Sequence, residues 1–142
     1  MTGRLRAPYD RRVLFLDMRI LVFGTFDRLH PGHRFLLAEA AKRGELMVVV
    51  ARDVTVERLK GHTPHQTEEE RRQAVRQAFP GAQVILGHET DYREPVRQVR
   101  PELIIMGYDQ ALPPGVTTGD FPCRVERLPA FQPERYKSSH FR

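Results

Sequence analysis

Short apolar runs recur along the chain, separated by longer mixed segments. Four of them are rich in Val, Ile and Leu and contain no polar residue: residues 20–23, 46–51, 84–86 and 103–106. Continuous runs of this kind are typical of strands buried on both faces of a parallel sheet. A fifth stretch, residues 124–128, alternates between polar and apolar side chains and predicts an edge strand.

Helical periodicity occupies the segments between these runs. Residues 31–43 place apolar side chains on one face and end before a glycine, and residues 67–79 begin with a capping box formed by Thr67 and Glu70. A shorter helix is predicted within residues 91–101. Strands that alternate with helices predict an α/β fold: one Rossmann-like, doubly wound parallel sheet of about five strands with flanking helices.

Two segments do not fit this alternation. Residues 111–122 contain three prolines and two glycines where a crossover helix would be expected, so we predict an irregular loop there. Residues 1–17 precede Met18, which stands directly before the first predicted strand. We therefore expect residues 1–17 to be a disordered or surface-bound N-terminal extension and residues 18–142 to form the domain.

Length and composition narrow the class of protein. The chain has 142 residues, of which 40% are hydrophobic and 29% charged, as expected for one soluble globular domain. The longest apolar run, residues 46–51, is far shorter than the ~20 residues of a membrane span. The single cysteine, Cys123, forms no internal disulfide, which fits a cytoplasmic location. We expect no membrane partner.

The charge balance favours an anionic small molecule over nucleic acid. Lys and Arg number 23 against 18 Asp and Glu, giving a net charge of +5. This excess is spread along the chain and forms no basic stripe interleaved with aromatic residues, so we expect no nucleic-acid partner. A modest positive charge also attracts a nucleoside triphosphate.

Candidate chemistry follows the first predicted strand, in residues 24–33. Ligands of open parallel sheets bind beyond the carboxyl ends of the strands. Pro31 and Gly32 are typical of a helix start with accessible amides, which is a phosphate-binding feature, and Gly24 leaves room for a ligand to approach the backbone. His30 and His33 face the same mouth and provide donors to phosphate. The alternatives are an ordinary helix cap or a metal site, but two histidines seldom hold a metal alone, and we assign no metal ligand.

Residues 24–33 match the Gly-x-Phe-Asp-x-x-His-x-Gly-His signature, by which the chain resembles the cytidylyltransferase-like nucleotidyltransferases. Further matches follow in order: Val-Val-Val-Ala-Arg-Asp at 48–53, Thr-Val at 55–56, Lys-Gly at 60–61, Gly-Tyr-Asp-Gln at 107–110 and Tyr-Lys-Ser-Ser at 136–139. Together they are most similar to the small archaeal-type FAD synthases, which adenylylate FMN. The resemblance covers the chain from Met18 onward.

The resemblance implies roles for individual residues. The catalytic set would be His30, His33 and Lys60, and Asp27 would have a structural or metal-linked role. The residues expected to bind the nucleotide are Gly24, Thr25, Phe26, Gly32, Gly107, Tyr108, Asp109, Ser138 and Ser139, with Arg142 near them. Some of these residues have simpler explanations: Lys60 as a solvated helix end, and Asp109 or the serine pair as helix caps.

The chain also departs from the family pattern. The family usually has a helix between the Gly-Tyr-Asp-Gln segment and the last strand, where this chain has the proline-rich residues 111–122. The family also usually continues the final helix well beyond the serine pair, whereas here residues 140–142 alone follow. Both departures concern the C-terminal half of the expected site.

The expected function is nucleotidyl transfer from ATP or CTP to a phosphorylated acceptor, with Mg²⁺ on the phosphates and release of pyrophosphate. FMN with ATP is the first choice. The alternatives are a cytidylyltransferase acting on glycerol 3-phosphate and a nucleotide-binding module without turnover. An FMN acceptor needs an apolar wall for its ring, for which residues 111–122 and Phe131 are candidates. Dimers are frequent in the family that the chain resembles, so a homodimer is a candidate assembly, and the sequence leaves the oligomeric state open.

Overall fold

The computed structural model describes residues 18–130. They form a five-stranded sheet with the order β3-β2-β1-β4-β5, in which every neighbouring pair is parallel. The strands are β1 (Arg19–Gly24), β2 (Glu45–Val50), β3 (Gln83–Leu86), β4 (Leu103–Met106) and β5 (Arg124–Arg127). All five predicted strands are therefore present, and the alternating one, β5, lies at an edge as expected.

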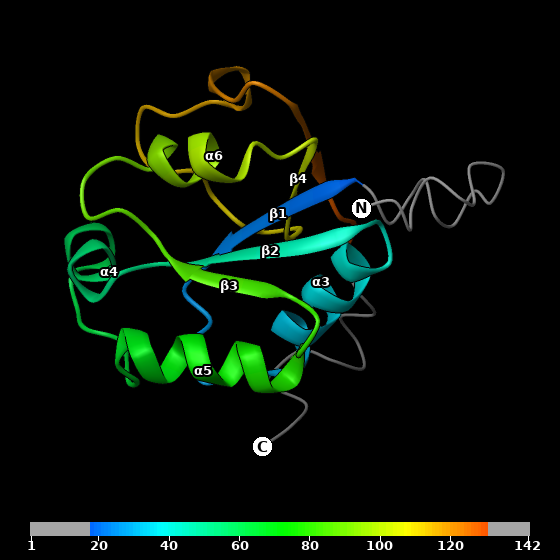
Figure 1. The fold of residues 1–142 in the computed structure, drawn as a ribbon. Helices are drawn as coiled ribbons and strands as arrows, with labels where there is room; N and C mark the ends of the chain where they lie inside the picture. The colour runs from blue at the N-terminus through cyan, green and yellow to red at the C-terminus, as the bar shows by residue number, and fades with distance from the viewer. Residues whose placement is uncertain (1–17, 131–142) are drawn as a thin grey trace, which may run out of the picture.

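Helices cover both faces of the sheet, so the predicted doubly wound α/β fold is confirmed (Figure 1). One face carries α3 (Pro31–Ala41) and α5 (Glu68–Ala78), and the other carries α6 (Arg93–Val99). Successive side chains of β1 point to opposite faces: Ile20 packs on the α3 side and Leu21 on the α6 side. Burial on both faces explains why the interior strands are continuously apolar.

The helix starts follow the sequence signals closely. Thr67 is the N-cap of α5: its side chain accepts from the Glu70 amide while the Glu70 side chain accepts from the Thr67 amide. This is the predicted capping box. Pro31 occupies the first turn of α3, also as expected.

One helix was not predicted. Residues Asp53–Lys60 form α4, which lies at the edge of the sheet toward which the strand arrows point (Figure 1). Val56 is its buried residue, so the segment shows no apolar stripe that would mark a helix. Its end follows a regular rule, because Gly61 adopts φ 80° as the C-cap.

The connection from β4 to β5 is the irregular loop that the prolines predicted. It contains one short 3₁₀ turn, η1 (Thr118–Asp120), and then buries Phe121 against the α6 face. The loop thus takes the place of a crossover helix.

Some predictions fall outside the described residues. These are the proposed extension over residues 1–17, and Phe131, Ser138, Ser139 and Arg142 near the C-terminus. Within residues 18–130, no helix is long and apolar enough to cross a membrane.

Candidate active site

A cavity of about 1000 Å³ opens above the carboxyl ends of β1, β2 and β4. This is where a parallel sheet is expected to bind a ligand, and β1 is the strand at which the order of the sheet reverses. The described residues of the predicted site that line it are Gly24, Thr25, Phe26, His30, Gly32, His33, Lys60, Gly107, Tyr108 and Asp109. Segments far apart in the sequence therefore meet at one mouth.

His30 and His33 together form the N-terminal cap of α3. The Nδ1 atom of His30 accepts from the amides of Gly32 at 3.1 Å and His33 at 3.4 Å. The Nδ1 atom of His33 accepts from the His30 amide at 3.3 Å. The two rings stack with centroids 3.6 Å apart, and the edge of the His33 ring meets Phe26. The pair is thus a capping box made of imidazoles.

This arrangement changes one detail of the expected phosphate site. The sequence suggested that amides at the start of α3 would be available to a ligand, but those of Gly32 and His33 donate to His30. Because each Nδ1 accepts a hydrogen bond, a neutral ring carries its proton on Nε2. The Nε2–H groups are therefore the donors that the histidines offer to the cavity.

Both histidines are held in the neutral form. Burial lowers the pKa of His33 to about 4, with further lowering by the charges of His30 and Lys60. Burial also lowers the pKa of His30. Near pH 7 both rings are consequently neutral donors, while Lys60 supplies positive charge.

The lowered pKa of His33 predicts a pH dependence of stability. The folded protein binds this proton only near pH 4, whereas the unfolded chain binds it near pH 6.5, so the free energy of unfolding should fall as pH drops from 6.5 toward 4. The variant His33→Gln lacks this titrating group, so its free energy of unfolding should fall less between pH 7.5 and pH 5. Urea unfolding of both proteins at the two pH values would measure the difference. An equal loss in both proteins would contradict the assignment.

Thr25 and Lys60 meet across the mouth from different elements. Lys60 is the last residue of α4, and its Nζ lies 3.4 Å from the Thr25 hydroxyl oxygen. The helix that was not predicted thus brings the predicted lysine beside the loop after β1. A lysine placed there can contact phosphate oxygens bound at the histidines.

Gly24 is required by the packing of Phe26. A Cβ atom at Gly24 would lie 2.6 Å from the Phe26 ring, which is 1% exposed. Phe26 adopts φ 55°, so the loop turns its ring back over β1. Gly24 also lines the cavity, so its role in letting a ligand approach the backbone stays a prediction.

Asp27 has a structural role. Its carboxylate accepts from the amides of His65 at 2.8 Å and Gln66 at 3.0 Å, and Asp27 does not line the cavity. Burial would raise the pKa of Asp27, but these amides and the His65 ring together lower it. Asp27 thereby joins the loop after β1 to the segment before α5.

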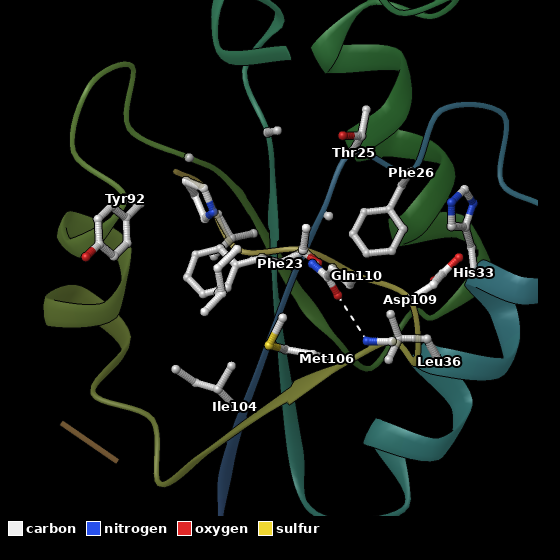
Figure 2. Close-up of a pocket in the computed structure, with 18 of the residues that line it drawn as sticks. Phe23, Thr25, Phe26, His33, Leu36, Tyr92, Ile104, Met106, Asp109 and Gln110 are labelled. Atoms are coloured by element: carbon white, nitrogen blue, oxygen red, sulfur yellow. Dashed lines mark hydrogen bonds between the residues drawn. The ribbon is translucent and has the colours of Figure 1, made fainter. Parts of the chain in front are cut away.

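The segment after β4 is held by two residues that the predicted site lacked. The Gln110 side chain accepts from the Gly107 amide (dashed line in Figure 2) and donates to the carbonyl of Phe23. Arg127 donates to the carbonyls of Gly107, Tyr108 and Gln110. Gln110 was visible in the Gly-Tyr-Asp-Gln motif, whereas no sequence signal pointed to Arg127.

Arg71 is the main support beneath the site. Its side chain is fully buried and donates to the carbonyls of Thr25 and Ala51 at 2.8 Å each and to that of Gln66 at 3.1 Å. It also pairs with Asp53 at 2.6 Å. Arg71 therefore joins the ends of β1 and β2 to the start of α4, and sequence periodicity did not reveal its burial.

The described residues 18–130 contain no group of three or more His, Cys, Asp or Glu side chains able to hold a metal ion. Asp109 is the acidic residue among those that line the cavity. Within the described part of the chain, Asp109 is thus the carboxylate that a divalent cation in the cavity could contact, together with oxygen atoms of a substrate.

Comparison with known proteins agrees with this geometry. A curated FAD synthase of Aciduliprofundum boonei is 51% identical over 94 residues, which are 66% of this chain and 62% of that protein. The FAD synthase of Methanopyrus kandleri is 47% identical over 67% of this chain and 65% of its own length. The chain thus matches less than two thirds of the length of these two relatives. The FAD synthase of Methanosarcina mazei is 40% identical over 91% of this chain and 85% of its own length.

A solved structure shares the fold. The lipopolysaccharide core biosynthesis protein from Thermoplasma volcanium aligns with a TM-score of 0.72 at 33% identity, covering 81% of this chain and 98% of that one. The family model described as cytidylyltransferase-like matches residues 21–140, which include the whole cavity and its two histidines. The chain belongs to the cytidylyltransferase-like family.

Proposed function

We propose that this protein transfers the adenylyl group of ATP to the phosphate of FMN, forming FAD and pyrophosphate. The observation that carries the proposal is the pair of neutral imidazoles at the start of α3, with Lys60 beside them, in the cavity above β1. The acceptor is suggested by the three relatives above, each of which is a curated FAD synthase.

The reaction needs no covalent intermediate on the protein. An oxygen of the FMN phosphate attacks the α-phosphorus of ATP, and the bond from that phosphorus to the bridging oxygen of the β-phosphate breaks. The electron pair of that bond stays with the leaving pyrophosphate. The protein contributes position and charge stabilisation.

The Nε2–H groups of His30 and His33 would donate hydrogen bonds to the negative charge that develops on the phosphate oxygens in the transition state. Neutral imidazoles donate hydrogen bonds without requiring a proton to be lost, so they stabilise the transition state without acting as acids. Lys60 would bind the β- and γ-phosphate oxygens and hold them for departure. Asp109, whose charge acts on His30, would accept from the hydroxyls of the ribose.

Mg²⁺ would enter as part of the nucleotide substrate. Mg²⁺ usually keeps several waters and binds through substrate phosphates and one or two carboxylates, which fits a cavity whose described lining contains Asp109 as its acidic residue. When bound, the ion would neutralise phosphate charge. Use of ATP over CTP, a homodimeric state and a cytoplasmic location belong to the same proposal.

Release of pyrophosphate tests the proposal directly. FMN and glycerol 3-phosphate should each be offered with ATP and with CTP, and we expect the highest kcat/KM for FMN with ATP. Turnover of glycerol 3-phosphate with CTP and none of FMN would replace the acceptor while keeping nucleotidyl transfer. Binding of nucleotide without pyrophosphate release under all four conditions would contradict an enzyme.

A further inference from the structure

The cavity has two ends that differ in chemistry, one on each face of the sheet. The polar end lies on the α3 face and includes His30, His33 and Asp109. The other end lies on the α6 face. In Figure 2, Tyr92 and Phe23 stand on the side away from His33 and Asp109. A ligand that fills both ends has a charged group at one end and an apolar group at the other.

Three aromatic residues from separate segments meet at the apolar end. Phe23 is the second-last residue of β1, Tyr92 precedes α6, and Phe121 follows η1. The rings of Phe23 and Phe121 have centroids 6.3 Å apart, and those of Tyr92 and Phe121 are 5.8 Å apart at 79°. We call these three residues the aromatic wall. All three residues line the cavity.

Further apolar residues lie around the wall. Ile104 and Met106 of β4 and Leu112 and Pro113 of the proline-rich loop line the same end. That loop was expected to provide an apolar surface, and the structure adds Phe23 and Tyr92, which no motif marked. The guanidinium of Arg93 lies 5.4 Å from the centre of the Tyr92 ring and fixes this ring from outside.

The triphosphate and the ribose do not account for this surface. In the proposed function the triphosphate lies at the histidines and the ribose at Asp109, both on the α3 face. A small acceptor such as glycerol 3-phosphate would place its phosphate at the histidines and leave the aromatic wall uncovered. A flat apolar ring attached to the acceptor phosphate by a chain would cover it.

We propose that the aromatic wall binds the isoalloxazine ring of FMN and that Tyr92 is the ring-contacting residue that selects a flavin over a small phosphorylated acceptor. This inference rests on the proposed function. Tyr92 suits the role because a tyrosine can expose its hydroxyl to solvent at the rim of the cavity while its ring offers an apolar face to a ligand. Phe23 and Phe121 form the floor beneath it.

The test measures FMN binding to the full chain by the change in flavin fluorescence, with and without α,β-methylene-ATP. Tyr92→Leu should raise the Kd for FMN about tenfold or more, because it removes the ring that contacts the flavin. Tyr92→Phe should stay within about threefold of the wild type, because the ring remains. Val54→Ala is the control: Val54 is 49% exposed on α4 and does not line the cavity, so its loss should leave FMN binding unchanged.

Several outcomes would overturn the inference. These are an unchanged FMN Kd in Tyr92→Leu, an equal loss in Val54→Ala, or a rise in the Kd for ATP in place of FMN. Should Tyr92→Leu fail to fold, the wild-type protein decides: nuclear Overhauser contacts between the flavin ring methyls and the Tyr92 ring are expected, and their absence from a bound FMN would overturn it.

The proposed function and this inference fail in different ways. One result is that the wild type releases pyrophosphate from FMN and ATP while Tyr92→Leu binds FMN normally. This result would support the proposed function and contradict the role of Tyr92. Absence of both FMN binding and pyrophosphate release in the wild type would overturn the proposed function and, with it, this inference.

Discussion

Replacing His33 by alanine is expected to lower kcat by about 10²- to 10³-fold while changing the KM for ATP far less. The Nε2–H of His33 would act mainly on charge that develops as pyrophosphate leaves, so its loss affects the transition state more than nucleotide binding. Steady-state measurement of pyrophosphate release with saturating FMN gives both constants. A variant with nearly wild-type kcat would contradict the assigned role.

Matched variants separate the catalytic role of each histidine from its role in capping α3. His33 accepts from the His30 amide, so His33→Ala also removes one half of the capping box. Gln at the same position can accept that hydrogen bond. We therefore expect His33→Gln to retain more thermal stability than His33→Ala and yet to be slow. At the N-cap, His30→Asn serves the same purpose, because Asn caps helices well.

Replacing Arg71 by methionine should lower the free energy of unfolding by about 3 kcal/mol or more. Met fills much of the volume but leaves the part-buried carbonyls of Thr25, Ala51 and Gln66 without their donor, each at a cost of about 1 kcal/mol or more. Arg71→Lys should lose less, since one ammonium replaces part of the fork. Denaturant unfolding measures the change.

Arg76 provides the control for this substitution. It lies on the same helix, α5, but is exposed, so Arg76→Met should change stability by less than about 0.5 kcal/mol. A loss below about 1 kcal/mol in Arg71→Met would contradict the supporting role of Arg71. We also expect Arg71→Met to lower activity, because Arg71 fixes the carbonyl of Thr25 next to Lys60.

The strands were predictable because each of the four continuous runs is buried on both faces. Ile104, for example, packs on the α6 face while its neighbour Ile105 packs on the α3 face, so no polar position interrupts the pattern. The capping box at Thr67 was equally local. Features determined by neighbours in the sequence are the ones that a pattern reveals.

The features that were missed depend on contacts between distant segments. Helix α4 has one buried residue, Val56, and its position depends on Arg71, which reaches it from α5. The burial of Arg71 itself follows from three carbonyls on other elements. Likewise, the His-x-Gly-His motif predicted two histidines at a helix start. Only the structure shows that the Nδ1 atom of His30 accepts hydrogen bonds from the amides of Gly32 and His33.

The most direct test of the central claim follows the phosphorus atoms of ATP. With FMN as acceptor, label in the α-phosphate of ATP should appear in FAD and label in the γ-phosphate should appear in pyrophosphate. This outcome would establish that the FMN phosphate attacks the α-phosphorus. Label from the γ-phosphate in inorganic phosphate or in the flavin, with none from the α-phosphate in FAD, would contradict the account.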